Sequence, residues 1–264
     1  ARFVASYDRG ALPEQVSTPF VVDVTPPSAE VRLDPVPFSP DNDGVDDELT
    51  IALNLQDQSD IAYWLFEIRD RNNQFFQEFG GRGAPAEKII WDGRSANGEY
   101  VISAEDYPYT FEVADIYGNS TTREGQIPVD ILVIREGEQL KVQISNINFA
   151  PNSPELILDP DTQIGSKNQQ VLNRLAEIFQ KYDAYRIKIA GHAVNITGTE
   201  REEVEELQPL SLSRAESVKA ALVERGISAN RITTVGQGGT EPLVPHTDLD
   251  NRWKNRRVEF ILIR

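Results

Sequence analysis

The sequence of 264 residues contains no cysteine, no methionine and only two histidines. Without cysteine, a disulfide framework, a thiol nucleophile and a cysteine-ligated zinc site are all excluded. No apolar run approaches the roughly eighteen residues that a membrane-spanning helix needs. Because the chain starts at Ala1 without an initiator, we expect a fragment or processed form, with any membrane contact made through a segment outside this sequence.

Acidic residues outnumber basic ones, and the excess lies in the first half of the chain. The net charge is −16, and residues 1–135 carry 10 Lys and Arg against 24 Asp and Glu, whereas residues 136–264 carry 16 against 18. An acidic surface repels phosphate backbones, so we expect no nucleic-acid partner. The unequal charge also indicates two different modules.

Residues 28–134 show the pattern of a β-domain. Apolar residues alternate with polar ones at 49–55, 109–113 and 127–133, which gives each segment one buried face. Turn sequences such as DNDG at 41–44 separate the alternating segments. Since no helical period is evident, the pattern predicts a small antiparallel sandwich.

Residues 1–27 are expected to be the terminal strand and linker of a preceding β-module. Phe20 and Val22 alternate, and the Pro26-Pro27 pair then ends the strand because proline cannot donate to a sheet. In the sandwich segment itself, FSPDNDGVDDELTI at 38–51 and WDGRSANGEYV at 91–101 resemble immunoglobulin-like modules of flagellar hook-capping and gliding-motility proteins. This resemblance implies a spacer or docking module without chemistry.

After Arg135 the spacing of apolar residues changes, and helical stripes alternate with strand-like segments as in an α/β domain. Residues 135–145 are expected to form a linker strand, and Ser166 with Gln169 predicts a capping box at the start of a helix. The helix would carry its apolar stripe from Val171 to Tyr182. Further strands are expected at 185–190, 231–235 and 258–263, with a second helix at 211–225. The order β-α-β-α-β-β predicts an α/β sandwich over 146–264.

Several motifs of this second half, in the right order, resemble the OmpA-like domain that anchors outer-membrane proteins to peptidoglycan. They are FAPNSPEL at 149–156, IAGHA at 189–193, LSLSRAESVKAALVERGI at 210–227, RITTVGQGGTEP at 231–242 and NRRVEF at 255–260. The resemblance implies a pocket for the diamino acid of the stem peptide, in which an Asp takes the ammonium group and an Arg takes the carboxylate. It also implies a location at the periplasmic face of the outer membrane.

The implied pocket keeps its cation and lacks its anion. Arg214 stands at the family's Arg position, in the expected first helical turn, whereas Val194 stands at the Asp position. Leu207 replaces a usual Asn, and Asn195 and Ser211 complete the pocket positions. A buried ammonium group beside valine would find no acceptor, so we expect peptidoglycan binding to be weak or lost.

The loop between Gly198 and Leu210 is longer than usual and holds five glutamates, at 200, 202, 203, 205 and 206. One hypothesis is that a glutamate turns inward and replaces the missing acid. The alternative, which we favour, is a solvated acidic face, because like charges repel one another and prefer water.

Other chemistry-bearing residues have simpler interpretations. His192 and His246 are each isolated, and we expect His192 to make a structural hydrogen bond. Asp41, Asp43 and Asp46 are a weak calcium candidate, although an Asx-rich turn explains them better and the EF-hand pattern fails. The three tryptophans, Trp64, Trp91 and Trp253, are expected to pack in the core or at its rim.

We expect no cofactor and no enzyme activity, because no nucleophile–base pair, metal cluster or phosphate loop is evident. Three function classes remain: an envelope protein with a divergent OmpA-like domain, which we favour; a working peptidoglycan anchor that uses Arg214 and a substitute acid; and an enzyme. In the first class the partners would be envelope proteins.

Overall fold

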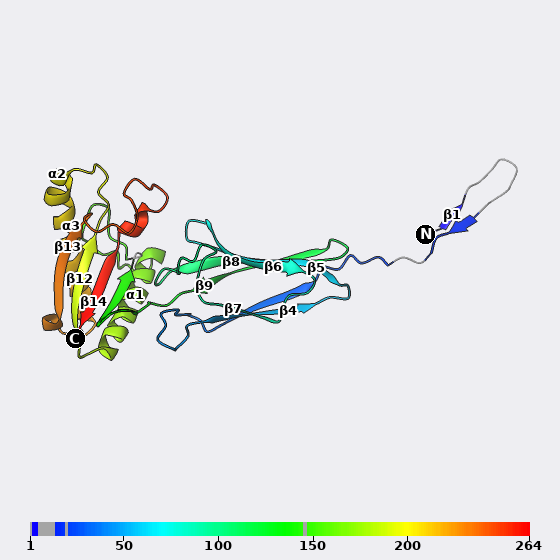
Figure 1. Cartoon of the computed structure of the whole chain (residues 1–264), viewed down its shortest axis with the longest axis horizontal. Helices are drawn as coiled ribbons and strands as arrows, with labels where there is room; N and C mark the ends of the chain where they lie inside the picture. The colour runs from blue at the N-terminus through cyan, green and yellow to red at the C-terminus, as the bar shows by residue number, and fades with distance from the viewer. Residues whose placement is uncertain (1, 5–13, 19–20, 145–146) are drawn as a thin grey trace.

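The structure, a computed structural model, describes residues 2–4, 14–18, 21–144 and 147–264. The chain is elongated: a β-sandwich lies between a short N-terminal hairpin and a C-terminal α/β domain (Figure 1). No helix among the described residues is both long enough and apolar enough to cross a bilayer.

The N-terminal hairpin pairs β1 (Arg2–Val4) with β2 (Glu14–Val16) in an antiparallel ladder. The strand expected through Val22 is wrong, because residues 21–27 form no strand, and Phe20 lies outside the described residues. Val21 and Val22 are each 70% exposed and Val24 is 78% exposed, so these residues bury no apolar face that would stabilise a strand there.

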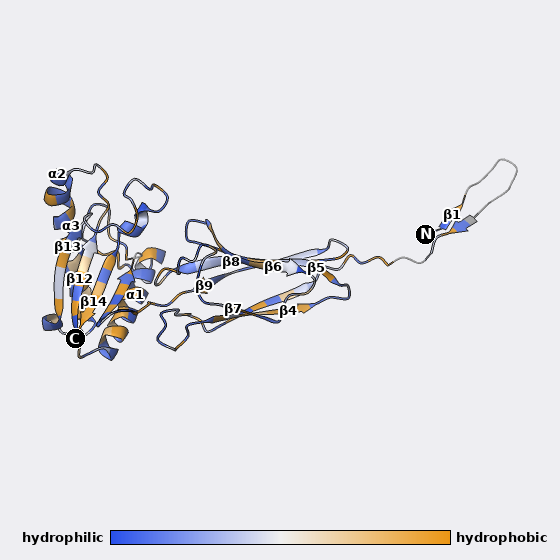
Figure 2. Ribbon diagram, viewed as in Figure 1, coloured by the Kyte–Doolittle hydropathy of each residue, from blue (hydrophilic) through white to orange (hydrophobic). Residues whose placement is uncertain are grey.

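The sandwich consists of two antiparallel sheets with orders β3-β4-β7 and β6-β5-β8-β9. Their strands are β3 (Ser28–Asp34), β4 (Leu49–Gln56), β5 (Ile61–Arg69), β6 (Phe75–Arg82), β7 (Lys88–Trp91), β8 (Asp106–Asp115) and β9 (Ser120–Pro128). Apolar residues from both sheets form one buried cluster, and Figure 2 shows hydrophobic residues on strands of both sheets.

The period-two pattern explains which side chains form this core. Leu49, Ile51 and Leu53 of β4 are buried while the residues between them are not, and Phe111 and Val113 do the same on β8. The expected strand at 127–133 is only partly correct, since β9 ends at Pro128. The residues that follow cross into the second domain and are buried at the junction instead.

The α/β domain has a five-stranded sheet of order β10-β11-β14-β12-β13, in which only β12 and β13 are parallel. Its elements are β10 (Ile134–Glu136), β11 (Gln139–Ile144), α1 (Gln163–Lys181), β12 (Arg186–His192), α2 (Glu200–Glu202), a π-helical turn (Glu203–Leu207), α3 (Gln208–Glu224), a 3₁₀ turn (Ala229–Arg231), β13 (Ile232–Gly238), a second 3₁₀ turn (Arg252–Asn255) and β14 (Val258–Ile263). Helices α1 and α3 share one apolar cluster with the sheet. The expected α/β class is therefore confirmed.

Two local predictions in this domain are wrong. Residues 135–145 are no linker strand, because β10 and β11 form the edge of the domain's own sheet. Helix α1 starts at Gln163, since the Thr162 hydroxyl accepts a hydrogen bond from the Gly165 N–H at 3.0 Å and caps the helix one turn before Ser166.

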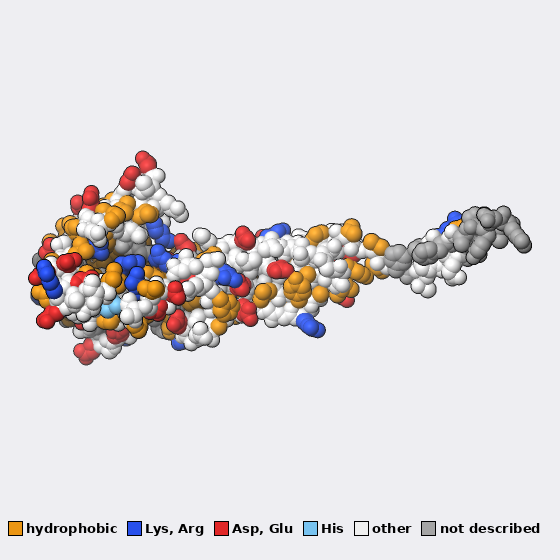
Figure 3. Space-filling model, turned by 90° about the horizontal axis from the view of Figure 1, so that it is seen from above, with side chains coloured by type: hydrophobic (Ala, Val, Ile, Leu, Met, Phe, Trp, Pro, Cys, Tyr) orange, Lys and Arg blue, Asp and Glu red, His pale blue; other side chains and the backbone are white. Residues whose placement is uncertain are grey.

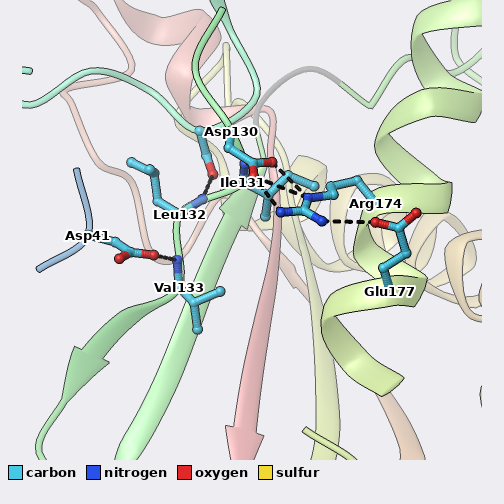
Figure 4. Close-up of polar contacts among 8 residues, drawn as sticks. Asp41, Asp130, Ile131, Leu132, Val133, Arg174 and Glu177 are labelled. Carbon is cyan, nitrogen blue, oxygen red and sulfur yellow. Dashed lines mark hydrogen bonds and ion pairs between the residues drawn. The ribbon is translucent and has the colours of Figure 1, made fainter. Parts of the chain in front are cut away.

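The sandwich and the α/β domain are joined by a packed, charged contact. Arg174 of α1 holds Asp130 through two parallel hydrogen bonds and also pairs with Glu177, as Figure 4 shows. Asp41 accepts the Val133 N–H at 2.9 Å across the same region (Figure 4). The junction is therefore an interface with defined partners.

Candidate functional site

Four arginine side chains surround a cavity where the α/β domain meets the sandwich. The cavity has a volume of about 200 Å³. Its lining comes from the start of the α/β domain, the end of β12, helix α3, the segment before and within β14, and the β5–β6 turn of the sandwich: Ile147, Asn148, Phe149, Gly191, His192, Arg214, Trp253, Arg256, Arg257, Val258 and Arg71. We call it the Arg214 cavity. Lys and Arg side chains gather on this part of the surface (Figure 3).

Gly191 allows α3 to pack directly on the end of β12. A Cβ at this position would overlap the backbone carbonyl of Ser211, so only glycine permits the close approach. The buried Ser211 hydroxyl then accepts the Gly238 N–H and donates to the Gln208 carbonyl, each at 3.0 Å. These contacts fix the helix that carries Arg214.

Arg214 is half-buried beside an aromatic ring and has no acidic partner among the residues that the structure describes. Its Nε donates to the Ser153 carbonyl at 3.1 Å, and its guanidinium lies 5.0 Å from the centre of the Phe149 ring. Burial lowers the pKa of Arg214, and the charge of Arg256 lowers it further. Among the described residues, no Asp or Glu lines the cavity.

The expectation that Arg214 occupies the first turn of its helix is wrong. Helix α3 starts at Gln208 and continues directly from the π-helical turn, so Arg214 lies in about the second turn. The free N–H groups of a helix N-terminus are therefore not beside Arg214, and its own guanidinium is the source of positive charge.

The other four expected pocket residues do not line the Arg214 cavity. Val194 is buried with 7% of its surface exposed, and Leu207 is half-buried in the π-helical turn. Asn195 accepts the Gly198 N–H at 2.7 Å, and Ser211 makes the structural contacts given above. The structure thus brings Arg214 into the cavity without the other four.

Glu203 is the acid of the loop that turns inward. It is 8% exposed, and its two carboxylate oxygens accept the Gly239 N–H at 3.0 and 2.9 Å. Asn195 donates to it at 3.3 Å. The five glutamates are therefore not uniformly solvated, because the π-helical turn directs one of them to the end of β13.

His192 is buried without the expected structural hydrogen bond. Both of its ring nitrogens are buried and have no hydrogen-bond partner among the described residues, and a carboxylate oxygen of Glu259 lies 3.8 Å from Nε2. Burial, together with the neighbouring Arg257, lowers the pKa of His192 to about 4. The imidazole is consequently neutral at physiological pH.

Arg257 and Glu259 form a buried ion pair behind His192. Their Nε and Oε1 atoms are 2.7 Å apart, and Lys141 lies 3.2 Å from the other oxygen of Glu259. Burial raises the pKa of Glu259, but Arg257 together with His192 and Lys141 outweighs this effect, and the net shift of the pKa is downward. One terminal nitrogen of Arg257, Nη1, is buried without a partner.

Sequence reasoning gave no role to three of the arginines that line the cavity, Arg71, Arg256 and Arg257. Arg71 belongs to the sandwich, and its guanidinium lies 4.8 Å from the centre of the Trp253 ring. No local motif could connect these residues, which are far apart in the sequence. Arg256 and Arg257 belong to the NRR motif at 255–257, which matched the OmpA-like pattern without an expected role. Trp253, expected in the core or at its rim, lines the cavity, whereas Trp91 is core as expected.

The acidic turn before β4 brings carboxylates together, although not the expected three. Oxygens of Asp41, Asp43 and Asp47 lie within 4.8 Å of one another, and Asp46 is not among them. Asp47 accepts two backbone N–H groups of the turn, at 2.6 and 2.8 Å, and Asp43 accepts another at 2.8 Å. This is the hydrogen bonding of an Asx-rich turn.

Comparison with known proteins identifies the second domain. The OmpA family model matches residues 149–256. The peptidoglycan-binding protein ArfA of Mycobacterium tuberculosis is 32% identical over 118 residues, which are 45% of this chain and 35% of that protein. Outer membrane protein A of Bordetella avium is 32% identical over 121 residues, which are 43% of this chain and 60% of that protein.

Among solved structures, a putative MotB-like protein from Desulfovibrio vulgaris is 27% identical, with a TM-score of 0.41. The matched region is 50% of this chain and 77% of that protein's chain. The match to ArfA spans about a third of the length of that mycobacterial protein. Residues 149–256 are an OmpA-like domain.

Proposed function

We propose that this chain is part of a non-catalytic envelope protein at the periplasmic face of the outer membrane. In this protein the OmpA-like domain is a structural or interaction module that binds peptidoglycan weakly or not at all. The relatives named for peptidoglycan binding and for the outer membrane support the envelope location. The lining of the Arg214 cavity supports the loss of peptidoglycan affinity.

The observation that carries the proposal is the unbalanced charge of this cavity. A diamino acid brings an ammonium group together with its carboxylate, but the described lining offers arginines and no acid. Val194, at the position where an Asp is expected, does not itself line the cavity but is buried two residues after His192, which does, and its side chain has no acceptor. A lost charge-assisted hydrogen bond costs about 1.5–3 kcal/mol, so affinity should be roughly 10- to 100-fold below that of an intact site.

Calorimetric titration of the chain with diaminopimelate tests this proposal. The wild type should bind diaminopimelate far more weakly than an OmpA-like control does, and Val194→Asp should raise the affinity at least roughly ten-fold. Val194→Asn is the matched control, because it adds an acceptor of the same size without the charge. Wild-type binding at the control's level, with no gain from Val194→Asp, would refute the proposal.

The alternative function is a working peptidoglycan anchor in which Glu203 supplies the acid. The burial of this one loop glutamate favours it, although its carboxylate already accepts the Gly239 N–H. Glu203→Gln keeps the side-chain shape and removes the charge. On the anchor hypothesis this variant loses diaminopimelate binding, whereas on our proposal it leaves the weak binding unchanged.

We further propose that the sandwich is an immunoglobulin-like spacer. Two packed antiparallel sheets with three and four strands support this assignment. The Arg174–Asp130 contact would hold the spacer at a fixed angle to the OmpA-like domain. Its acidic surface would then be the part available to envelope partners.

A further inference from the structure

Two of the four arginines that line the Arg214 cavity have no carboxylate partner in the described part of the chain. Arg71 pairs with Glu105 at 2.6 Å and Arg257 pairs with Glu259 at 2.7 Å, so their charges are balanced. Arg214 and Arg256 have no ion pair among the described residues, and they repel each other. The cavity therefore carries two uncompensated positive charges.

Three residues that line the cavity carry buried side-chain nitrogens with no hydrogen-bond partner in the described part of the chain. Trp253 Nε1 and Arg257 Nη1 are buried without partners, and so is the imidazole of His192, although His192 and Arg257 are only 3% and 5% exposed. An indole N–H and a guanidinium N–H can only donate, so what they lack is an acceptor. Leaving such donors unpaired is unfavourable, and a bound oxygen ligand would remove that cost.

The sandwich completes one wall of this cavity. Arg71 projects from the β5–β6 turn and lies over the Trp253 ring, while its ion pair with the buried Glu105 holds it to its own domain. The indole is thereby placed by a side chain from outside the OmpA-like domain. The site thus depends on both domains, and Arg71 acts as a positioning residue.

We propose that the Arg214 cavity binds a small dianion without an ammonium group, a dicarboxylate or a phosphate. Its two charges would neutralise Arg214 and Arg256, and its oxygens would accept from Trp253 and Arg257. A volume of about 200 Å³ admits a compact ligand of this kind. The proposal rests on the proposed function, since an acid in the site would repel a dianion.

Calorimetry on the whole chain at low salt tests the proposal with three probes: pimelate, diaminopimelate and inorganic phosphate. Pimelate and diaminopimelate share the same dicarboxylate chain and differ in the two amino groups. We expect pimelate or phosphate to bind at least roughly ten-fold more tightly than diaminopimelate, because the amino groups would face two guanidinium groups. Whichever of the two dianions binds more tightly identifies the class of acid.

Three variants locate the binding. Arg256→Gln removes one exposed, unpaired charge and should weaken dianion binding roughly ten-fold or more. Trp253→Phe keeps a ring under Arg71 but removes the N–H, and it should weaken binding by roughly 3- to 10-fold. Arg201→Gln, on the exposed α2, is the matched control and should change nothing.

The proposal is overturned if neither dianion binds, or if Arg256→Gln weakens binding no more than Arg201→Gln does. The outcomes also separate it from the proposed function. If no dianion binds and Val194→Asp restores diaminopimelate binding, only the dianion proposal fails. If the wild type binds diaminopimelate as tightly as an OmpA-like control does, and more tightly than pimelate, both proposals fail.

Discussion

His192 should make the stability of the OmpA-like domain depend on pH in mildly acidic solution. Its pKa is lowered from 6.5 to about 4, because burial disfavours the imidazolium and Arg257 repels it, against a smaller opposing effect of Glu259 and Glu241. Lys141 also disfavours the charged form. Between these two pH values the unfolded chain binds a proton that the folded chain does not.

The sign and size of the effect follow from this difference. Stability is full above about pH 6.5 and falls as the pH drops toward 4, because protonation favours the unfolded state. At about 1.36 kcal/mol for each pKa unit, the loss reaches at most about 3 kcal/mol. His192→Gln has no titrating group at this position and should lose less stability over the same range.

Urea denaturation at each pH, followed by far-ultraviolet circular dichroism, measures the free energy of unfolding of the OmpA-like domain, since helices α1 and α3 both lie in that domain. The stability difference between wild type and His192→Gln should change by up to about 3 kcal/mol between pH 7 and pH 4. Imidazole NMR signals, assigned with the same variant, give the pKa directly. Parallel pH dependences, or a His192 pKa near 6.5, would refute this account of the buried imidazole.

Other changes test the packing around the cavity and the junction. Gly191→Ala should destabilise the OmpA-like domain by about 1–3 kcal/mol in urea denaturation, because its Cβ would overlap the Ser211 carbonyl; an unchanged midpoint contradicts this. Arg174→Ala should lower the stability to thermal unfolding by about 1 kcal/mol, since the arginine is half-exposed. It should also change the small-angle scattering profile, because the Arg174–Asp130 pair would hold the sandwich at a fixed angle to the OmpA-like domain; an unaltered profile would contradict that role. Calcium should leave the melting temperature unchanged; a rise that Asp43→Asn abolishes would instead establish an ion site.

The class of each domain could be predicted because hydrophobic period is a local property of the sequence. Alternation at 49–55 identified β4, and the apolar stripe from Val171 identified α1. Helix boundaries were less accurate, since two residues, Thr162 and Ser166, could both cap α1 and the sequence alone does not choose between them.

The composition of the cavity could be predicted only in part. Arg214 was found by its motif, but the contribution of Arg71 depends on how two domains pack, which no local pattern encodes. The inward turn of Glu203 depends on a π-helical turn, and five glutamates in one loop gave no sign of which would be buried. The unpaired nitrogens of His192 became evident only from the distances around it.

The most direct test of the central claim, that the site keeps a cation without an opposing acid, is titration of diaminopimelate into wild type and Val194→Asp side by side. Our account predicts weak or undetectable binding to the wild type and a gain of at least roughly ten-fold in the variant. Strong binding to the wild type that the new aspartate does not improve would contradict it.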